Sequence, residues 1–349
     1  MTKMKKKILI APLNWGLGHA ARCIPIINAL IRHDFEPILA SDGDALTLLQ
    51  KEFPQLTSYA LPSYNIKYSK SKNQKIKLVL NSPTILKASI NEQKAILEIH
   101  KKENLSGIIS DNRFGVRLKE IPSVYITHQI NVLSGNTTTI TSNLHQKIIA
   151  KFDQCWVPDS KDTILSGKLS TFDNKKLTIK YIGAISRFEK QTLPKKYDLL
   201  IVLSGPEPQR TLLEEKIIVE LKTSTEKVLL VRGVFSKTVL PEINKHITVV
   251  NYMLTKQLEQ AINESRIVLS RSGYSTILDL AKLEKKAFFI PTPGQDEQEY
   301  LAQRMADLNI APFATQNDFK LNMLAKVVNY DGFVSSNETS LKASLFELF

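Results

Sequence analysis

Short apolar runs alternate with longer segments of helical period along almost the whole chain. The apolar runs end in Gly, Ser, Asn or Asp, and the first long segment, residues 20–33, places Ile24, Ile27 and Ile31 on one face. Parallel strands need a crossover long enough for a helix, so this alternation is typical of βαβ units. The sequence therefore predicts an α/β fold with parallel sheets.

Two series of such units follow each other within 349 residues, a length that fits about two domains. The first series has predicted strands at 7–12, 36–40, 107–110, 124–127, 154–157 and 180–182. The second has predicted strands at 197–203, 227–232, 247–250, 267–269 and 287–290, with helices at 209–221, 256–262 and 275–283. We predict a Rossmann-like domain over 1–186, a linker over 187–197, a second such domain over 198–335, and a helix over 336–349 that crosses back to the first domain. A cleft between the domains is the expected ligand site.

The composition is that of a globular protein. Hydrophobic residues make up 43% and charged residues 23%, which argues against disorder, and no apolar run approaches the roughly 20 residues that cross a bilayer. Residues 8–13 follow four lysines but are too few for the apolar region of a signal peptide. Cys23 and Cys155 are too few for a disulfide framework or a structural zinc site. A cytoplasmic protein is expected.

The positive charge is concentrated in one place. Lys and Arg exceed Asp and Glu by 47 to 34, a net charge of +13, and residues 63–90 contain six lysines and no acid. These lysines are Lys67, Lys70, Lys72, Lys75, Lys77 and Lys87, with Tyr64 and Tyr68 among their apolar neighbours. The segment fits a solvated loop, an anionic membrane or acceptor, or nucleic acid. No zinc finger, aromatic RNA-binding motif or basic heptad supports nucleic acid.

A glycine-containing loop joins the first predicted strand to the first helix. Gly16, Gly18 and Ala21 fit the spacing G-x-G-x-x-G/A, and Asp42 follows the second predicted strand. This pattern is found where a dinucleotide pyrophosphate meets a helix start, so an NAD(P)-dependent oxidoreductase is one hypothesis. A tight strand-to-helix turn favours small residues whatever binds there, so the match alone is not decisive.

His19 lies at the start of the helix that follows this loop. The positive end of a helix disfavours the imidazolium, so a neutral histidine that accepts a proton is one interpretation. A packing or capping histidine is the other. His128 also lies at a predicted strand end, whereas the remaining histidines fit surface or packing positions.

A second strand-to-helix loop, residues 270–276, reads Ser-Arg-Ser-Gly-Tyr-Ser-Thr. Unpaired amides at a helix start, with hydroxyls and Arg271 nearby, form a receptor for phosphate oxygens. Thr276 and Asp279 also fit a capping box, which is a purely structural alternative. Asp279 lies about 200° round the helix from Ile277, so its carboxylate points away from the packed face and could accept both hydroxyls of a ribose. Gln298 and Glu299, near the next helix start, suit sugar hydroxyls.

Taken together, these motifs resemble the MurG-like glycosyltransferases of family 28, most strongly over residues 267–307. The resemblance implies the GT-B fold, in which two Rossmann-like domains face each other across a cleft. It implies donor diphosphate contacts from Ser204, Gly205, Arg232, Arg271, Ser272, Gly273, Ser275 and Thr276. It implies nucleoside contacts from Asn251, Tyr252, Met253 and Asp279, and donor-sugar contacts from Gln298 and Glu299. On the acceptor side it implies Asn14, Gly16, Gly18, Asp111, His128 and Gln129, with His19 as the catalytic base.

The resemblance favours one chemistry over its rivals, because a dehydrogenase gives no reason for a second phosphate loop followed by a ribose acid. We expect an inverting, metal-independent and cofactor-free transfer of a hexose or N-acetylhexosamine from a UDP-sugar to an acceptor hydroxyl. The expected partners are the nucleotide sugar and a lipid-linked or anionic acceptor at the inner face of the cytoplasmic membrane, and no nucleic acid. A nucleotide-sugar 2-epimerase or hydrolase of the same fold stays open as an alternative, followed by an NAD(P)-dependent oxidoreductase.

Overall fold

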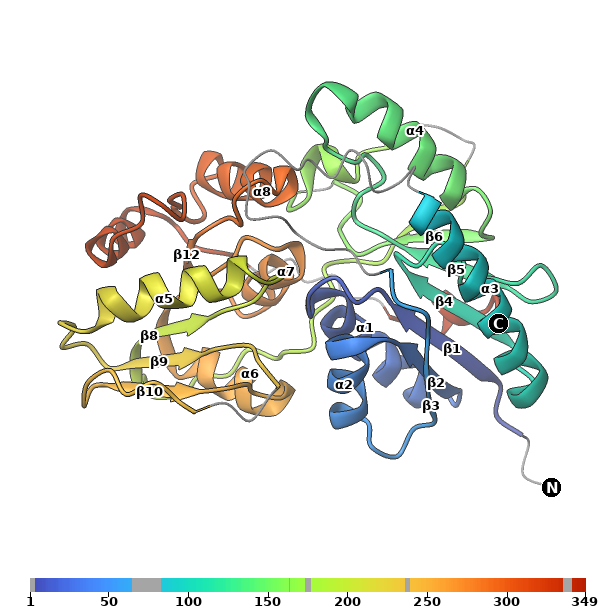
Figure 1. Ribbon diagram of the computed structural model, residues 1–349, viewed down its shortest axis with the longest axis horizontal. Helices are drawn as coiled ribbons and strands as arrows, with labels where there is room; N and C mark the ends of the chain where they lie inside the picture. The colour runs from blue at the N-terminus through green and yellow to red at the C-terminus, as the bar shows by residue number, and fades with distance from the viewer. Residues whose placement is uncertain (1–3, 65–82, 163, 173–176, 236–238, 335–340) are drawn as a thin grey trace. The chain divides into compact units, whose positions relative to one another are not determined.

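The computed structural model describes residues 4–64, 83–162, 164–172, 177–235, 239–334 and 341–349. These residues form two compact units (Figure 1). The first unit contains the described residues up to 185 together with 341–349, and the second contains residues 186–334. Of the six lysines between 63 and 90, only Lys87 lies within the described residues, where it is exposed.

The first unit is built on a parallel sheet in the order β3-β2-β1-β4-β5-β6-β7. Its strands are β1 (Lys7–Pro12), β2 (Glu36–Ser41), β3 (Ser58–Ala60), β4 (Gly107–Asp111), β5 (Ser123–Ile126), β6 (Gln154–Val157) and β7 (Ile179–Tyr181). Its helices are α1 (Gly18–Arg32), α2 (Gly43–Glu52), α3 (Pro83–Glu103) and α4 (Thr138–Ile149), with 3-10 helices η2 (Gly135–Thr137), η3 (Gly167–Leu169) and η5 (Ala343–Phe346). The strand order reverses between β1 and β4, where α/β sheets bind ligands at the carboxyl ends of the strands.

The second unit repeats this arrangement with a parallel sheet in the order β10-β9-β8-β11-β12. Its strands are β8 (Tyr197–Val202), β9 (Val228–Val231), β10 (Ile247–Val250), β11 (Ser265–Ser270) and β12 (Lys286–Phe289). Its helices are α5 (Gln209–Leu221), α6 (Thr255–Asn263), α7 (Tyr274–Lys282) and α8 (Asp296–Asp307), followed by the 3-10 helix η4 (Leu321–Asn329). Here the order reverses between β8 and β11.

The predicted fold class is confirmed. Each predicted strand is present, with its ends shifted by at most two residues, because buried parallel strands read as short apolar runs. The short strand β3 was not predicted, since its three residues Ser-Tyr-Ala are half-buried or exposed and form no apolar run. Helices α2, α3 and α4 were not assigned from the sequence either.

Residues 341–349 complete the core of the first unit. The rings of Phe346 and Phe349 lie 5.8 and 6.3 Å from the ring of Trp156, which is fully buried. The side chain of Phe349 occupies the space that a Cβ on Gly107 would need, and Lys6 donates a hydrogen bond to the Phe349 carbonyl oxygen (2.6 Å). This part of the chain therefore packs against β4 and β6 of the first unit.

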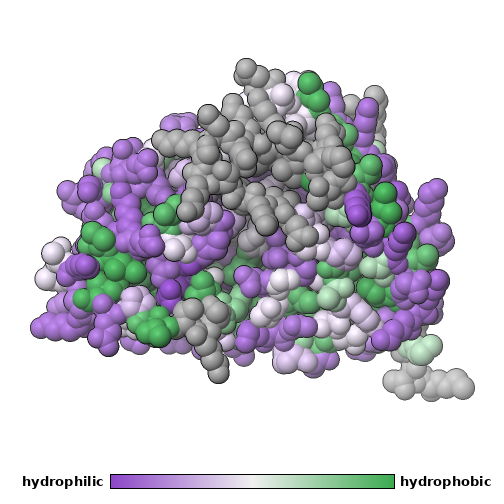
Figure 2. All heavy atoms as spheres, in the orientation of Figure 1, coloured by the Kyte–Doolittle hydropathy of each residue, from purple (hydrophilic) through white to green (hydrophobic). Residues whose placement is uncertain are grey.

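Where described residues form the face shown in Figure 2, hydrophilic residues are spread among small apolar groups. Within the described residues, every helix is too short or too polar to cross a bilayer.

Candidate functional site

Loops from β1 and β4 meet at the point where the strand order of the first sheet reverses. Pro12 and Asp111 are neighbours in the register of these two strands. The chain leaves β1 through Gly16, whose φ of +77° is a backbone conformation that favours glycine, and enters α1 at Gly18. The first turn of α1 and the last residue of β4 therefore lie side by side.

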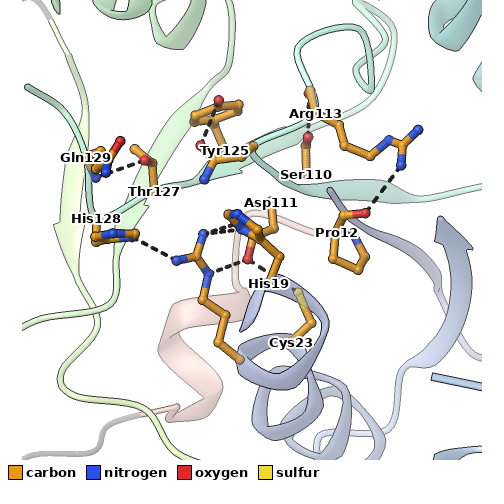
Figure 3. A network of polar contacts seen from close by, with 12 residues as sticks. Pro12, His19, Cys23, Ser110, Asp111, Arg113, Tyr125, Thr127, His128 and Gln129 are labelled. Carbon is orange, nitrogen blue, oxygen red and sulfur yellow. Dashed lines mark hydrogen bonds and ion pairs between the residues drawn. The ribbon is translucent and has the colours of Figure 1, made fainter. Parts of the chain in front are cut away.

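His19 and Asp111 form a hydrogen-bonded pair at this point (Figure 3). His19 Nδ1 lies 2.8 Å from Asp111 Oδ1, and the histidine side chain remains 15% exposed while the aspartate is fully buried. Arg22 Nη2 also lies 2.9 Å from His19 Nδ1, but this nitrogen already donates to Asp111 Oδ1. Because a carboxylate only accepts hydrogen bonds, we assign the imidazole proton to Nδ1, where it donates to Asp111. The Nε2 of His19 then carries the free lone pair and can accept a proton.

Arg22, one helical turn after His19, holds the other side of Asp111. Its Nε binds Asp111 Oδ2, its Nη2 binds Asp111 Oδ1, and the arginine is itself buried. Burial opposes the charge on Asp111, but Arg22 and then His19 outweigh it and hold the pKa of this carboxyl below its usual value. Asp111 is therefore an anion that keeps His19 in one orientation.

His128, labelled in Figure 3, joins the same network through a hydrogen bond with Arg22. Arg22 Nη1 donates to His128 Nδ1 at 2.9 Å, so a neutral His128 carries its proton on Nε2. Gln129, next in the chain, is partly buried, and its backbone N–H donates to Thr127 Oγ1 (3.0 Å). The structure thus brings His19, Asp111 and His128 together, as expected of an acceptor-side group.

The loop residue Asn14 has a structural partner on α2. Its Oδ1 accepts from the Ala45 N–H and its Nδ2 donates to Asp42, both at 3.3 Å. Asp42, the acid on which the dinucleotide hypothesis depends, also accepts from Nη1 of the buried Arg113 at 2.7 Å. Because this carboxylate is already paired, the geometry gives no support to an NAD(P) ribose at Asp42.

Loops from β8, β11 and β12 form the corresponding edge of the second sheet. Gly205, in the loop after β8, has a φ of +105°, and the partly buried Ser204 precedes it. Gly273 precedes α7, and a side chain added there would meet only open space. Ser275 and Thr276 lie partly exposed in the first turn of α7. This turn has the free space and the amides that an anion needs.

The predicted capping box is wrong. Helix α7 begins at Tyr274, so Thr276 is inside the first turn and cannot act as the N-cap, which is Gly273. Asp279 instead accepts from Ser186 Oγ at 2.6 Å. Burial raises the pKa of Asp279 from 3.8 to about 6, although Arg187 and the hydrogen bond from Ser186 oppose the shift. The carboxylate is thus available for ribose only in competition with Ser186.

Arg271 does not have the exposed position expected of a diphosphate ligand. Its Nη1 donates to the carbonyl oxygens of Ile290 (3.2 Å) and Pro291 (3.1 Å), and its Nη2 donates to Gln209 O (2.9 Å) and Gln316 Oε1 (2.7 Å). The arginine is 1% exposed, and burial lowers its pKa from 12.5 to about 9. Arg271 therefore links these loops to one another, and its direct contact with a diphosphate stays a prediction.

Three other polar side chains predicted to bind the donor are engaged within the second unit. Ser272 Oγ donates to Gln298 O (2.7 Å), Gln298 Oε1 accepts from the Thr292 N–H (2.9 Å), and Glu299 Oε1 accepts from the Gly294 N–H (3.1 Å). These bonds fix the loop between β12 and α8. Their contact with a donor sugar stays a prediction and would require exchange of these hydrogen bonds.

Arg232 is also paired. Its Nε binds Glu214 Oε1, and its Nη1 donates to Asn251 Oδ1 at 2.8 Å. Arg210 binds the other oxygen of Glu214 at 2.6 Å. The pairing of Arg232 with Glu214 reduces the positive charge available for a diphosphate there. The predicted nucleoside-binding residues follow β10, where the Tyr252 ring lies 4.9 Å from that of Phe235 and Met253 is partly buried.

Two residues of these sites were missed in the sequence. Arg22 lies three residues after His19, a spacing that places both on one helix face and could have identified it. Thr292 follows a buried strand in a polar turn, but its environment depends on residues distant in the sequence. Among the described residues, no group of three or more His, Cys, Asp or Glu side chains is arranged to hold a metal ion.

Comparison with known proteins places these sites in context. Residues 206–342 match the family model described as glycosyltransferase family 28 C-terminal domain. The UDP-N-acetylglucosamine–N-acetylmuramyl-(pentapeptide) pyrophosphoryl-undecaprenol N-acetylglucosamine transferase of Haemophilus ducreyi is 22% identical over 339 residues, covering 93% of this chain and 89% of the relative. The chain is a glycosyltransferase that is similar to the MurG enzymes along most of its length.

Solved structures of glycosyltransferases have the same fold as this chain. MurG of Acinetobacter baumannii matches with a TM-score of 0.56 and 13% identity, covering 99% of this chain and 100% of that one. The glycosyltransferase of kitacinnamycin matches with a TM-score of 0.62 and 14% identity, covering 93% and 90%. The two parallel-sheet units are thus those of the GT-B fold. Gly273 lies within the family-model match, and Gly205 directly precedes its first residue.

Proposed function

We propose that this glycosyltransferase transfers a sugar from a UDP-sugar to an acceptor hydroxyl with inversion and without a metal ion. The observation that carries the proposal is the His19–Asp111 pair, whose geometry leaves Nε2 of His19 free to accept a proton. The family 28 domain in the second unit supplies the donor side. The H. ducreyi relative is named for a UDP-N-acetylglucosamine donor, which supports uridine and an N-acetylhexosamine or hexose here.

The chemical step is a single displacement. The acceptor hydroxyl loses its proton to His19 Nε2 as its oxygen bonds to the anomeric carbon of the sugar. The bond from that carbon to the diphosphate oxygen breaks, and its electron pair leaves with UDP. Attack opposite the leaving group inverts the anomeric carbon. Asp111 stabilises the imidazolium that forms, and amides at the start of α7 face the negative charge of the leaving group.

An assay of UDP release tests the catalytic role of His19. UDP-N-acetylglucosamine, UDP-glucose and UDP-galactose are supplied with a polyprenyl diphosphate-linked saccharide as acceptor, and the anomeric configuration of the product is read by NMR. General base catalysis contributes about 10²–10⁴-fold, so His19→Ala should lose at least about 100-fold in kcat. His246→Ala, a histidine of the second unit outside both sites, is the control. Activity of His19→Ala within threefold of wild type would remove His19 from the chemistry.

Two further measurements separate this proposal from its rivals. Full activity in EDTA is expected, and a strict Mg²⁺ requirement would contradict the metal-free mechanism. UDP release that proceeds equally fast without any acceptor would indicate a hydrolase or an epimerase. No uptake of a nicotinamide cofactor is expected, since Asp42 is bound to Arg113.

The acceptor is proposed to be lipid-linked or otherwise anionic, at the inner face of the cytoplasmic membrane. The name of the H. ducreyi relative includes a pyrophosphoryl-undecaprenol acceptor, and residues 63–90 carry six lysines and no acid in the first half of the chain. Each lysine near an anionic membrane contributes about 1 kcal/mol of attraction. Flotation with phosphatidylglycerol vesicles at low salt should carry the protein upward. A protein that stays at the bottom of the gradient would contradict membrane binding and favour the interpretation of these lysines as part of a solvated loop.

A further inference from the structure

The hydroxyl of Thr292 is buried without a hydrogen-bond partner. Thr292 is 1% exposed, and both its backbone groups are used, the N–H by Gln298 Oε1 and the carbonyl oxygen by the Gln295 N–H. Its Oγ1 lies 3.8 Å from the position that a Cβ on Gly205 would take. The hydroxyl is therefore directed from the loop after β12 toward the loop after β8.

An unpartnered hydroxyl in a protein interior is unfavourable, because the group has lost its hydrogen bonds to water. A valine, which has the same shape, would avoid this loss. Polar side chains near Thr292 do have hydrogen-bond partners: Gln298 and Glu299 both accept hydrogen bonds from backbone N–H groups of this loop. The unused hydroxyl therefore fits a group that acquires its partner from a ligand.

The surroundings of Arg271 indicate that this ligand is negatively charged. Its guanidinium contacts Pro291, the residue before Thr292, and all four of its hydrogen-bond acceptors are neutral oxygens. Its Nε is a second buried donor without a partner. A buried cation that faces only neutral acceptors, beside an unused hydroxyl, favours an anion.

Two glycines at this edge of the sheet leave space beside their backbones. Gly205, opposite the hydroxyl, adopts a left-handed conformation with no side chain in the way. At the neighbouring loop, Gly273 faces open space before the nine-residue helix α7. The start of this helix adds partial positive charge to the same edge of the sheet.

We propose that Thr292 is a further donor-binding residue, whose hydroxyl donates a hydrogen bond to the sugar-bearing phosphate of the nucleotide diphosphate. The loop of Thr292 is held by Gln298, the residue assigned to the donor sugar, so the phosphate attached to the sugar is the one within reach. The positive charge of the buried Arg271 attracts this phosphate electrostatically. The inference rests on the proposed function and assigns to Thr292 a direct contact with the phosphate, in addition to the charge of Arg271.

Isothermal titration calorimetry with UDP and UMP tests this assignment. Thr292→Val should weaken UDP binding by about 10- to 100-fold, the effect of one hydrogen bond to a charged group, and leave UMP binding within twofold. Thr292→Ser keeps the hydroxyl and should bind UDP within threefold of wild type. Ser265→Ala, which removes a buried hydroxyl at the opposite end of β11, is the matched control and should leave both ligands unaffected.

The unfolding temperature gives an independent readout. Thr292→Val should unfold at a temperature no lower than that of wild type, because the substitution removes an unsatisfied hydroxyl and keeps the side-chain volume. If Thr292→Val does not fold, Thr292→Ala is used in the titrations. Unchanged UDP binding by Thr292→Val, or equal weakening of UDP and UMP, would overturn the assignment and leave the proposed function standing. A wild-type protein that binds neither UDP nor UMP would overturn both.

Discussion

At the scale of single residues, Arg22 and Asp111 neutralise each other inside the first unit. Removing one partner of a buried pair leaves an uncompensated charge, which costs about 3–5 kcal/mol. We expect Arg22→Met to lower the free energy of unfolding by about this amount, measured by urea denaturation at pH 7. Lys101→Met is the control, because its pair with Glu98 is exposed and worth at most about 1 kcal/mol. Equal unfolding midpoints for the two variants would contradict the assignment of a buried, charged pair.

A second prediction at this scale concerns the effect of Asp279 on the pH dependence of stability. Its pKa is raised to about 6, so the folded protein holds the Asp279 proton more tightly than the unfolded chain does. The stability due to this group is therefore present below about pH 4 and is lost as the pH rises to about 6. Asp279→Asn removes the charge and should raise the free energy of unfolding at pH 8 by about 1–3 kcal/mol.

Urea denaturation at pH 4 and pH 8 checks the sign of this effect. The difference between Asp279→Asn and wild type should nearly vanish at pH 4, where Asp279 is mostly protonated. Asp307→Asn, at an exposed position on α8, should follow the wild-type curve at both pH values. A variant that is less stable than wild type at pH 8 would contradict a disfavoured charge at Asp279.

At the scale of elements, two glycines with different surroundings make a matched pair. A Cβ on Gly115 would overlap the carbonyl oxygen of Ser89 on α3, where the Gly115 N–H binds Glu92 (2.9 Å). Gly115→Ala should therefore destabilise the first unit by about 2–3 kcal/mol, as overpacking does. Gly273→Ala meets only open space and should unfold at the same urea concentration as wild type. The reverse order of the two variants would show that the packing is wrongly assigned.

The elements also show which features local sequence can predict. The strand Gln154–Val157 was predicted with its correct bounds, because burial on both faces of a parallel strand requires a short apolar run. His19 was found because strand, turn and helix are contiguous there. The role of Arg271 was not, since its acceptors lie at residues 209, 290, 291 and 316. Such long-range hydrogen bonds leave no local pattern.

At the scale of the whole molecule, the first unit depends on residues that are far apart in the sequence. Phe349→Ala removes a buried ring beside Gly107 and Trp156, and such truncations cost about 3–5 kcal/mol. Hydrogen exchange followed by mass spectrometry should show lost protection in β4 and β6, with β8 and β11 unchanged. Phe349→Leu is the milder control. Equal loss of protection in both units would contradict the placement of Phe349 in the first unit alone.

The return of residues 341–349 to the first unit has a consequence for protein engineering. The second unit is inserted between two parts of the first, so no single cut separates the two units. A chimaera that takes its donor unit from another glycosyltransferase needs two splice junctions, one near residue 185 and one between residues 334 and 341. A fusion made at the first junction alone would leave the host without Phe346 and Phe349, and its sheet would lack two of the aromatic side chains around Trp156.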